Sequence, residues 1–245
     1  LFLNKDIALS HVQSMIKEGA SIIDIGGEST RPGASDVSVD EELQRVIPLI
    51  KAIRDVSDIP ISIDTSKIEV MHQAIEAGAS MINDVNALQA KGAVELAASL
   101  NVPVCVMHMQ GQPRTMQHTP DYENVVEEVK AFLQTRINVC VDAGIKKENI
   151  IIDPGFGFGK TLEHNLSLFK HLHELTTLGV PLLVGVSRKS MIGKILNNAA
   201  EDERLYGSVA LATLAAWKNA SIVRAHDIKA TVDALKLCMA VKNTN

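Results

Sequence analysis

The sequence predicts an α/β fold of the (β/α)8 TIM barrel class, and two observations support this prediction. The first is a series of short apolar segments that each run into polar or charged residues. They cover residues 21–28, 60–65, 80–85, 103–109, 149–155, 181–189 and 221–227. Their starts lie about 33 residues apart on average, which is the length of one strand, one helix and two short loops. Strands that alternate with helices form a parallel sheet covered by its crossover helices.

The second observation is a repeated transition from a helix to the next strand. EGASIID (18–24), EAGASMIND (76–84) and KNASIVRAHD (218–227) each indicate a helix end, a Gly or Asn cap in the left-handed conformation, and a short loop into a strand. This repetition favours a barrel. An open doubly wound sheet is the alternative, because a single sequence does not show whether the sheet closes. Seven strands are one fewer than a barrel needs, so we expect the first strand to be missing from the chain as given.

The elements between the strands follow from local patterns. Apolar residues at helical spacing predict an amphipathic helix over residues 5–18. The sequence SKIE at 66–69 has the form of a capping box and predicts a helix start directly after Asp64. Two longer segments, 26–40 and 109–121, each follow a strand and predict lids or binding loops.

Composition narrows the classes of protein and partner. A chain of 245 residues with 46% hydrophobic content suits one large core, so we expect a single domain over residues 1–245. The net charge of -5 argues against a nucleic-acid partner, which needs clustered Lys and Arg. No apolar run reaches the 18 or more residues of a membrane span. The three cysteines, Cys105, Cys140 and Cys238, share no metal or redox spacing, which predicts a reducing, cytoplasmic location.

Polar residues at the strand ends predict the site, because those ends converge at the barrel mouth where active sites lie. Asp64, Asn83 and Asp153 each end an apolar segment. Together they suit a polar heterocycle with amino and ring N–H groups, since a carboxylate accepts two parallel hydrogen bonds from such an edge. The alternative is that all three cap helices or pin loops.

Cationic residues follow the last two strands. Lys189, in GVSRKS, could be a Schiff-base nucleophile, a donor to a carbonyl or oxyanion, or a solvated residue. Arg224 and His226 lie two apart on one side of a strand and suit an anionic ligand. The turn DPGFGFGK (153–160) has three glycines that allow close backbone approach to a ligand, although it matches no Walker or dinucleotide fingerprint and could be a flexible turn.

Seven motifs, one at each predicted strand end, closely resemble those of the bacterial dihydropteroate synthases in the pterin-binding barrel family. They are GGESTRPG, SIDTSK, INDV, VMHMQG, DPGFGFGK, GVSRKS and VRAHD, and the resemblance covers residues 5–240. It implies a transferase of folate biosynthesis that joins p-aminobenzoate to 6-hydroxymethyl-7,8-dihydropterin diphosphate, giving 7,8-dihydropteroate and pyrophosphate. It also implies Mg²⁺ as cofactor, sulfonamides as inhibitors that compete with p-aminobenzoate, and a homodimer.

The resemblance assigns roles to individual residues. The pterin site would comprise Asp64, Asn83, Met107, Asp153, Phe158, Gly185 and Lys189. The diphosphate would be bound by Thr30, Arg224 and His226, and p-aminobenzoate by Arg31, Pro32 and Ser190. The residues that act on the reacting groups would be Asp64, Asp153, Lys189 and Arg224. The family's Asn metal ligand lies in a loop upstream of Leu1, so the metal site is unassigned and we expect activity to require that upstream strand.

The resemblance implies a dissociative substitution, in which the bond to diphosphate breaks early and the arylamine attacks a pterin-stabilised cation. Two other functions stay open at this point. A pterin-dependent methyltransferase domain would share the barrel and the Asp, Asn and Asp set, but it would not be expected to carry ESTRPG or the lysine of SRKS. A noncatalytic homologue would bind pterin and release no pyrophosphate.

Overall fold

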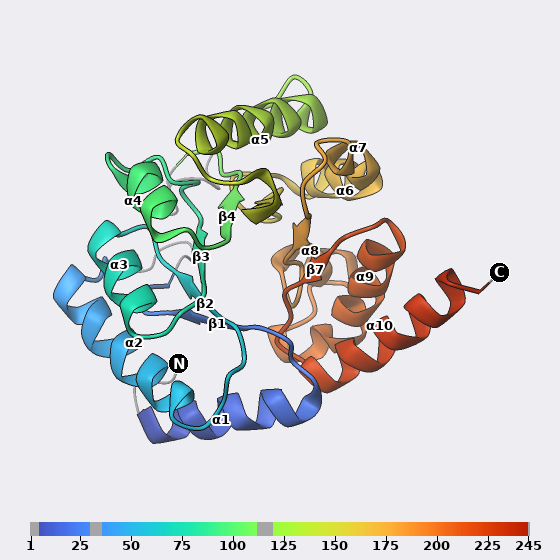
Figure 1. Cartoon of the computed structure of the whole chain (residues 1–245). Helices are drawn as coiled ribbons and strands as arrows, with labels where there is room; N and C mark the ends of the chain where they lie inside the picture. The colour runs from blue at the N-terminus through green and yellow to red at the C-terminus, as the bar shows by residue number, and fades with distance from the viewer. Residues whose placement is uncertain (1–4, 30–35, 112–119, 245) are drawn as a thin grey trace. The chain divides into compact units, whose positions relative to one another are not determined.

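The computed structural model describes residues 5–29, 36–111 and 120–244, and the chain divides into two compact units. Unit 1 comprises Leu1–Val106 and Arg136–Ile150, and unit 2 comprises Met107–Thr135 and Ile151–Asn245. Helices and strands alternate along the chain, from α1 in blue to α10 in red (Figure 1). Parts of both predicted loops, residues 30–35 and 112–119, lie outside the described residues.

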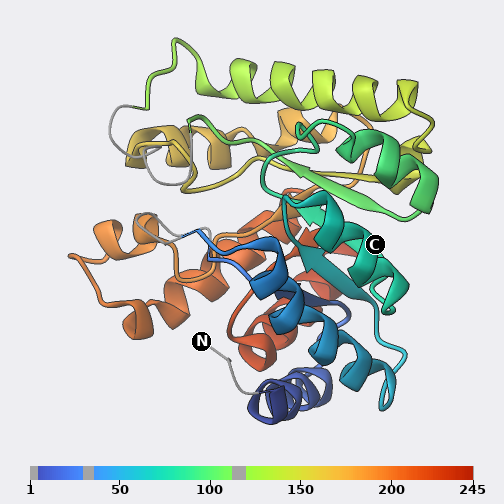
Figure 2. The ribbon, with the colours of Figure 1, turned by 90° about the vertical axis from the view of Figure 1, so that its left-hand side faces the viewer.

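Unit 1 contains four parallel strands in the order of the chain. Its elements are α1 (Lys5–Glu18), β1 (Ile23–Gly26), α2 (Val39–Arg54), β2 (Ile61–Asp64), α3 (Ile68–Glu76), β3 (Met81–Asp84), α4 (Ala93–Leu100) and β4 (Val104–Met107), whose last residue begins unit 2. Figure 2 shows the helices of this run beside its strands. The strands form because their β-branched side chains are buried: Ile61, Ile63, Ile82 and Val104 are fully buried.

Unit 2 begins at the end of β4 and contains the last strands. Helix α5 (Val125–Asp142) and strand β5 (Ile150–Asp153) each cross the boundary between the units, and η1 (Lys147–Asn149) lies between them. The remaining elements are α6 (Leu162–Lys170), α7 (Leu172–Thr176), β6 (Leu183–Val184), α8 (Ser190–Ile195), η2 (Glu201–Arg204), α9 (Leu205–Trp217), β7 (Ile222–Val223) and α10 (Ile228–Lys242). Strands β6 and β7 pair in parallel, and Ile152 bridges in parallel to Leu182.

The predicted elements are largely confirmed. Each of the seven apolar segments contains a strand, and the predicted first helix is α1 with the expected bounds. The left-handed caps in the three repeated transitions are also present: φ is 102° at Gly19, 115° at Gly78 and 70° at Asn219. Within the described part of the chain, no helix combines the length and apolar character needed to cross a membrane.

The predicted capping box is wrong. Helix α3 takes Lys67 as its N-cap residue without a side-chain bond, and the Ser66 hydroxyl donates to Asp84 Oδ1 at 2.5 Å. A tertiary partner therefore outcompetes the local cap, because a charge-assisted hydrogen bond to a buried carboxylate is stronger than a neutral one.

Candidate active site

In unit 1, the strand ends bring two of the predicted site residues together. Asp64 at the end of β2 is in register with Asn83 on β3, and the Thr65 N–H donates to the Asn83 carbonyl at 3.0 Å. The Asn83 side chain is nearly buried at 8% exposure and its Nδ2 lies 3.5 Å from Asp24 Oδ1, on β1. Adjacent parallel strands thus place the Asp64 carboxylate and the Asn83 amide side by side near their C-terminal ends, with the Asp24 carboxylate of β1 within reach of that amide.

Asp84 follows Asn83 and has a structural role. Its buried carboxylate accepts hydrogen bonds from the Ser66 hydroxyl and from the backbone N–H groups of Asn86 and Leu88, both at 2.8 Å. Burial raises the pKa of Asp84 above its ordinary value, and these three donors oppose that rise. The carboxylate pins a turn in which Leu88 has a φ of 55°.

A lysine forms ion pairs at the start of the segment with the motif ESTRP. Lys67 Nζ lies 2.5 Å from Glu28 Oε2 and 2.5 Å from Glu42 Oε2, and Glu42 is fully buried. The other Glu28 oxygen accepts the Val37 N–H at 3.1 Å, so one carboxylate joins both ends of the segment. The predicted ligand residues on this segment, Thr30, Arg31 and Pro32, lie outside the described residues.

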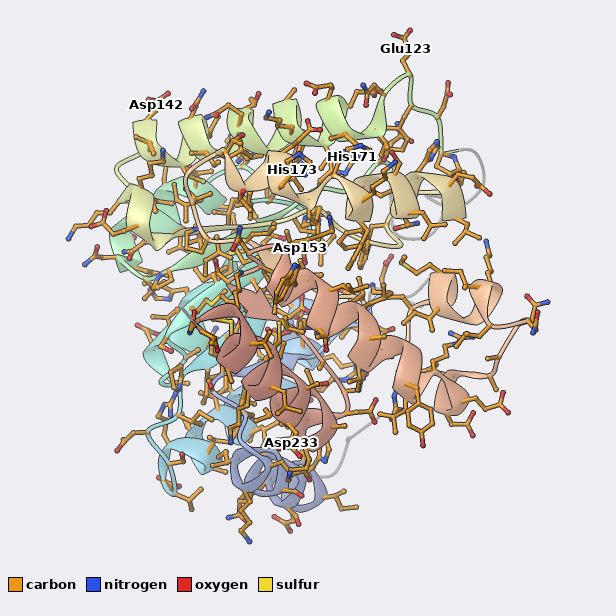
Figure 3. The ribbon with its side chains drawn as sticks, turned by 90° about the vertical axis from the view of Figure 1, so that its right-hand side faces the viewer. Glu123, Asp142, Asp153, His171, His173 and Asp233 are labelled. Atoms are coloured by element: carbon orange, nitrogen blue, oxygen red, sulfur yellow. The ribbon has the colours of Figure 1, made fainter. Side chains whose placement is uncertain are left out.

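In unit 2, Asp153 ends β5 where the glycine-rich turn begins. Its Oδ1 accepts the Gly155 N–H at 2.7 Å, and its carbonyl accepts the His108 N–H at 2.9 Å. Figure 3 labels Asp153 and shows the side chain of Glu123, which also belongs to unit 2, projecting outward. Burial raises the pKa of Asp153, and the Gly155 N–H and the nearby charges of Lys189 and Lys160 oppose the rise.

Lys189 and Phe158 lie together beside that turn. The Lys189 ammonium is 4.3 Å from the centroid of the Phe158 ring, which is a cation–π contact. A Cβ on Gly157 would lie 3.4 Å from Lys189 Cδ, so this glycine lets the lysine pass close to the turn. The structure therefore gathers Asp153, Phe158 and Lys189 around one turn of unit 2.

The other predicted residues of unit 2 have distinct surroundings. A Cβ on Gly155 would come within 3.3 Å of the buried Met107 side chain. Gly185 lies beside Arg224, because a Cβ there would be 3.8 Å from Arg224 Cβ. Ser190 is exposed at the first position of α8, directly after Lys189.

His226 is oriented by Ser187. The Ser187 hydroxyl oxygen accepts the His226 backbone N–H at 3.2 Å and lies 3.0 Å from His226 Nδ1. Burial and the charges of Arg224 and Arg188 lower the pKa of His226. A lowered pKa favours the neutral ring, and a neutral ring that accepts the hydroxyl proton at Nδ1 carries its own proton at Nε2.

Residues 187–189 lie beyond the strand, because β6 ends at Val184. Arg188 has a φ of 57° and forms a two-bonded ion pair with Asp227, with distances of 3.0 and 2.5 Å. The Arg188 guanidinium therefore supports the loop before α10.

Sequence reasoning missed the buried pair Lys160 and His108. Lys160 is 3% exposed, and its Nζ lies 2.9 Å from His108 Nδ1, 3.0 Å from the Gly155 carbonyl oxygen and 3.1 Å from that of Phe158. Burial lowers the pKa of Lys160 to about 7, although Asp153 opposes this. The one available signal was a lysine at the end of a glycine-rich turn, which is also typical of an exposed residue.

His108 predicts acid sensitivity. Burial and the charge of Lys160 lower its pKa to about 3, so between about pH 3 and 6.5 the unfolded chain binds a proton that the folded chain does not. Stability should therefore fall as the pH falls through this window, by up to about 1.4 kcal/mol per pH unit for this one group. Urea unfolding at several pH values should show a shallower slope for His108→Gln. An unchanged slope would mean that this histidine does not contribute.

The chain is similar to known proteins of one family. The family described as "Pterin binding enzyme" matches residues 1–226. Dihydropteroate synthase of Haemophilus influenzae is 54% identical over 242 residues, which cover 99% of this chain and 88% of that protein.

Two solved structures are similar over nearly the whole chain. The Yersinia pestis dihydropteroate synthase with a sulfonamide drug complex has a TM-score of 0.96 and 50% identity, covering 98% of this chain and 87% of that one. The Xanthomonas albilineans enzyme in complex with 7,8-dihydropteroate has a TM-score of 0.90 and 45% identity, covering 98% and 89%.

These similarities confirm the predicted α/β barrel class with parallel strands and exclude the open doubly wound sheet. They also separate this chain from the methyltransferase alternative, since family, relatives and structures agree on one enzyme. The chain therefore belongs to the pterin-binding enzyme family, as a bacterial dihydropteroate synthase.

Proposed function

We propose that this enzyme joins p-aminobenzoate to 6-hydroxymethyl-7,8-dihydropterin diphosphate, and that Asp64, Asn83, Asp153 and Lys189 bind the pterin. The product is 7,8-dihydropteroate and the leaving group is pyrophosphate. The observation that carries the proposal is the gathering of Asp153, Phe158 and Lys189 around one turn. An acceptor, a flat apolar wall and a cationic donor are the groups that a pterin ring requires.

The pterin is oriented by hydrogen bonds along its edges. Asp153 accepts two hydrogen bonds from the amino-pyrimidine edge, and Lys189 donates to the oxo and ring-nitrogen side. Asp64 and Asn83 contribute an acceptor and an amide, while Met107 and Gly185 form further walls. Lys189 acts as a donor and not as a Schiff-base nucleophile, because neither substrate offers an aldehyde or ketone to condense with.

The diphosphate is bound by Arg224 and His226, together with Thr30. Arg224 supplies a permanent positive charge, and His226 donates from Nε2 because Ser187 occupies Nδ1. Bond cleavage to the leaving group builds negative charge on the bridging oxygen, which these donors stabilise. The complementary positive charge on the pterin is stabilised by Asp64 and Asp153.

The second substrate, p-aminobenzoate, is held close to Ser190, Arg31 and Pro32, and sulfonamides compete for the same place. Its amine attacks the pterin cation once both substrates are aligned, so catalysis is electrostatic and positional. No covalent enzyme intermediate is needed. The molecules bound in the two related structures, a sulfonamide drug and 7,8-dihydropteroate, support this assignment.

We assign Mg²⁺ as the cofactor, because a diphosphate leaving group typically departs with this ion and Mg²⁺ binds through phosphates with few protein ligands. Over residues 5–29, 36–111 and 120–244, no group of three or more His, Cys, Asp or Glu side chains could hold a metal.

We further propose one pterin-binding domain over residues 1–245, which the continuous family match to residues 1–226 supports. A cytoplasmic location is supported by the three cysteines, which are buried thiols.

The decisive experiment for this function is a pyrophosphate-release assay with the complete purified protein and Mg²⁺. We expect release to require both the pterin diphosphate and p-aminobenzoate, and a sulfonamide to slow it in competition with p-aminobenzoate. Pterin binding without p-aminobenzoate-dependent release would favour the noncatalytic homologue.

A homodimer is the final part of the proposal, and helices α9 and α10 support it. Tyr206 and Trp217 lie eleven residues apart on one face of α9 and are 84% and 53% exposed. Leu237 and Val241 lie four apart on α10 and are 71% and 65% exposed. Exposed apolar side chains of this size are typical of an interface, and the occupant we propose is a second copy of this chain.

Leu237→Asp should convert the dimer to a monomer in sedimentation velocity, because a charge would have to be buried in the interface. Ile7→Asp, at a residue of α1 that is 58% exposed, is the matched control and should leave the dimer intact. A monomeric wild-type enzyme would contradict the proposal.

A further inference from the structure

A buried ammonium group lies beneath the glycine-rich turn. Lys160 Nζ contacts two carbonyl oxygens of the turn, those of Gly155 and Phe158, and also His108 Nδ1. At 3% exposure, this side chain has almost no access to water. Burying a cation costs free energy unless it is well paired, so a lysine at this position needs a reason that an apolar residue could not supply.

Both carbonyl contacts lead to a proposed pterin ligand. The Gly155 carbonyl accepts a hydrogen bond from Lys160, and the Gly155 N–H donates one to Asp153 Oδ1 at 2.7 Å. The Phe158 carbonyl also accepts a hydrogen bond from Lys160, and the centroid of the Phe158 ring lies 4.3 Å from the Lys189 ammonium. One ammonium group therefore fastens Gly155 and Phe158, the two residues that contact Asp153 and Lys189.

We propose that Lys160 is a positioning residue for the pterin site, which holds the turn so that the Asp153 acceptor and the Lys189 donor keep a fixed spacing. The inference rests on the proposed roles of Asp153 and Lys189. Lys160 is almost completely hidden from solvent by its own turn and by His108, and it acts through these neighbours.

A second side chain fixes the part of the turn that Lys160 does not reach. Asn165 is 3% exposed, its Oδ1 accepts the Gly157 N–H at 2.8 Å, and its Nδ2 donates to the Lys160 carbonyl at 3.2 Å. Positive φ angles of 67° and 80° at Gly155 and Gly157 make the turn a conformation that needs such restraint. Positioning is also independent of protonation, because a neutral amine keeps two N–H donors for the two carbonyls.

The test compares Lys160→Met, which keeps the length and loses all donors, with Lys160→Gln, which keeps an amide donor. Lys170→Met, at an exposed lysine of α6, is the matched control, and Leu168→Ala is the control for lost stability, because Leu168 is fully buried on the same helix. Calorimetry with 6-hydroxymethyl-7,8-dihydropterin gives the affinity, and thermal unfolding gives the stability. We expect Lys160→Met to weaken binding by roughly 10- to 100-fold, since misplacement by about 1 Å can cost about 10²-fold.

Lys160→Gln should recover part of that loss, whereas Leu168→Ala should lower the melting temperature and leave the affinity unchanged. Equal affinity in Lys160→Met and wild type would overturn the proposal, as would failure of both Lys160 variants to fold, which would make the lysine a folding residue. Asp153→Asn is measured in parallel. If Asp153→Asn also binds normally, the pterin site itself is misassigned; if only the Lys160 variants bind normally, the positioning role alone is wrong.

Discussion

Asp153→Asn is expected to weaken pterin binding by about 10² to 10⁴-fold, because it replaces a charged acceptor of two hydrogen bonds worth about 1.5–3 kcal/mol each. An amide presents one oxygen and one NH₂ group, so it opposes a donor edge with a donor. Folding should be little affected, since the asparagine oxygen can still accept the Gly155 N–H that Asp153 accepts at 2.7 Å. Calorimetry with 6-hydroxymethyl-7,8-dihydropterin measures the effect.

Asp84→Asn is the matched control for this prediction. Asp84 is also a carboxylate at a strand end, but its oxygens accept hydrogen bonds from Ser66, Asn86 and Leu88. Asp84→Asn should lower the free energy of unfolding and leave pterin affinity within about twofold of that of the wild type. A folded Asp153→Asn enzyme with wild-type affinity would remove Asp153 from the site.

Among alanine substitutions at the glycines of the turn, Gly155→Ala should lower the free energy of unfolding the most. A Cβ at this position would lie 1.9 Å from the His108 carbonyl oxygen, and φ is 67°. The backbone must shift to relieve such a contact. We therefore expect strain and overpacking together to lower the free energy of unfolding by about 2–6 kcal/mol. The same shift moves Asp153, so pterin affinity should fall as well.

Gly144→Ala provides the control for backbone conformation alone. Gly144 also has a positive φ, 98°, but a Cβ there would meet nothing within 4 Å. Gly144→Ala should lower the free energy of unfolding by about 1–2 kcal/mol and leave pterin affinity unchanged. Urea unfolding measures the free energy of unfolding of both variants, and calorimetry measures their pterin affinity. An equal decrease in the free energy of unfolding at the two positions would refute the steric argument.

The strands and helix ends could be predicted from the sequence because their causes are local. Alternation of apolar segments with helical patterns depends on neighbouring residues, and all seven strands follow from it. The left-handed caps at Gly19, Gly78 and Asn219 depend only on which residues tolerate positive φ. The strand-end rule also identified Asp64, Asn83 and Asp153 as candidates for the site.

What could not be predicted depends on partners far along the chain. Ser66 had the local pattern of a cap, but Asp84, 18 residues away, is its partner. Lys160 and His108 are 52 residues apart, and their contact exists only once the glycine-rich turn has folded. Lys67 likewise meets Glu28 across 39 residues. Periodicity carries no information on such pairs, so buried charges were the least predictable part of the site.

The pterin site is best tested by a crystal structure of the enzyme with bound 6-hydroxymethyl-7,8-dihydropterin. We expect the amino-pyrimidine edge of the ring to lie within about 3 Å of the Asp153 carboxylate oxygens, with the Lys189 ammonium at a similar distance from the oxo group. A pterin bound elsewhere, or in the same place with Asp153 facing away from its edge, would contradict the assignment of this site.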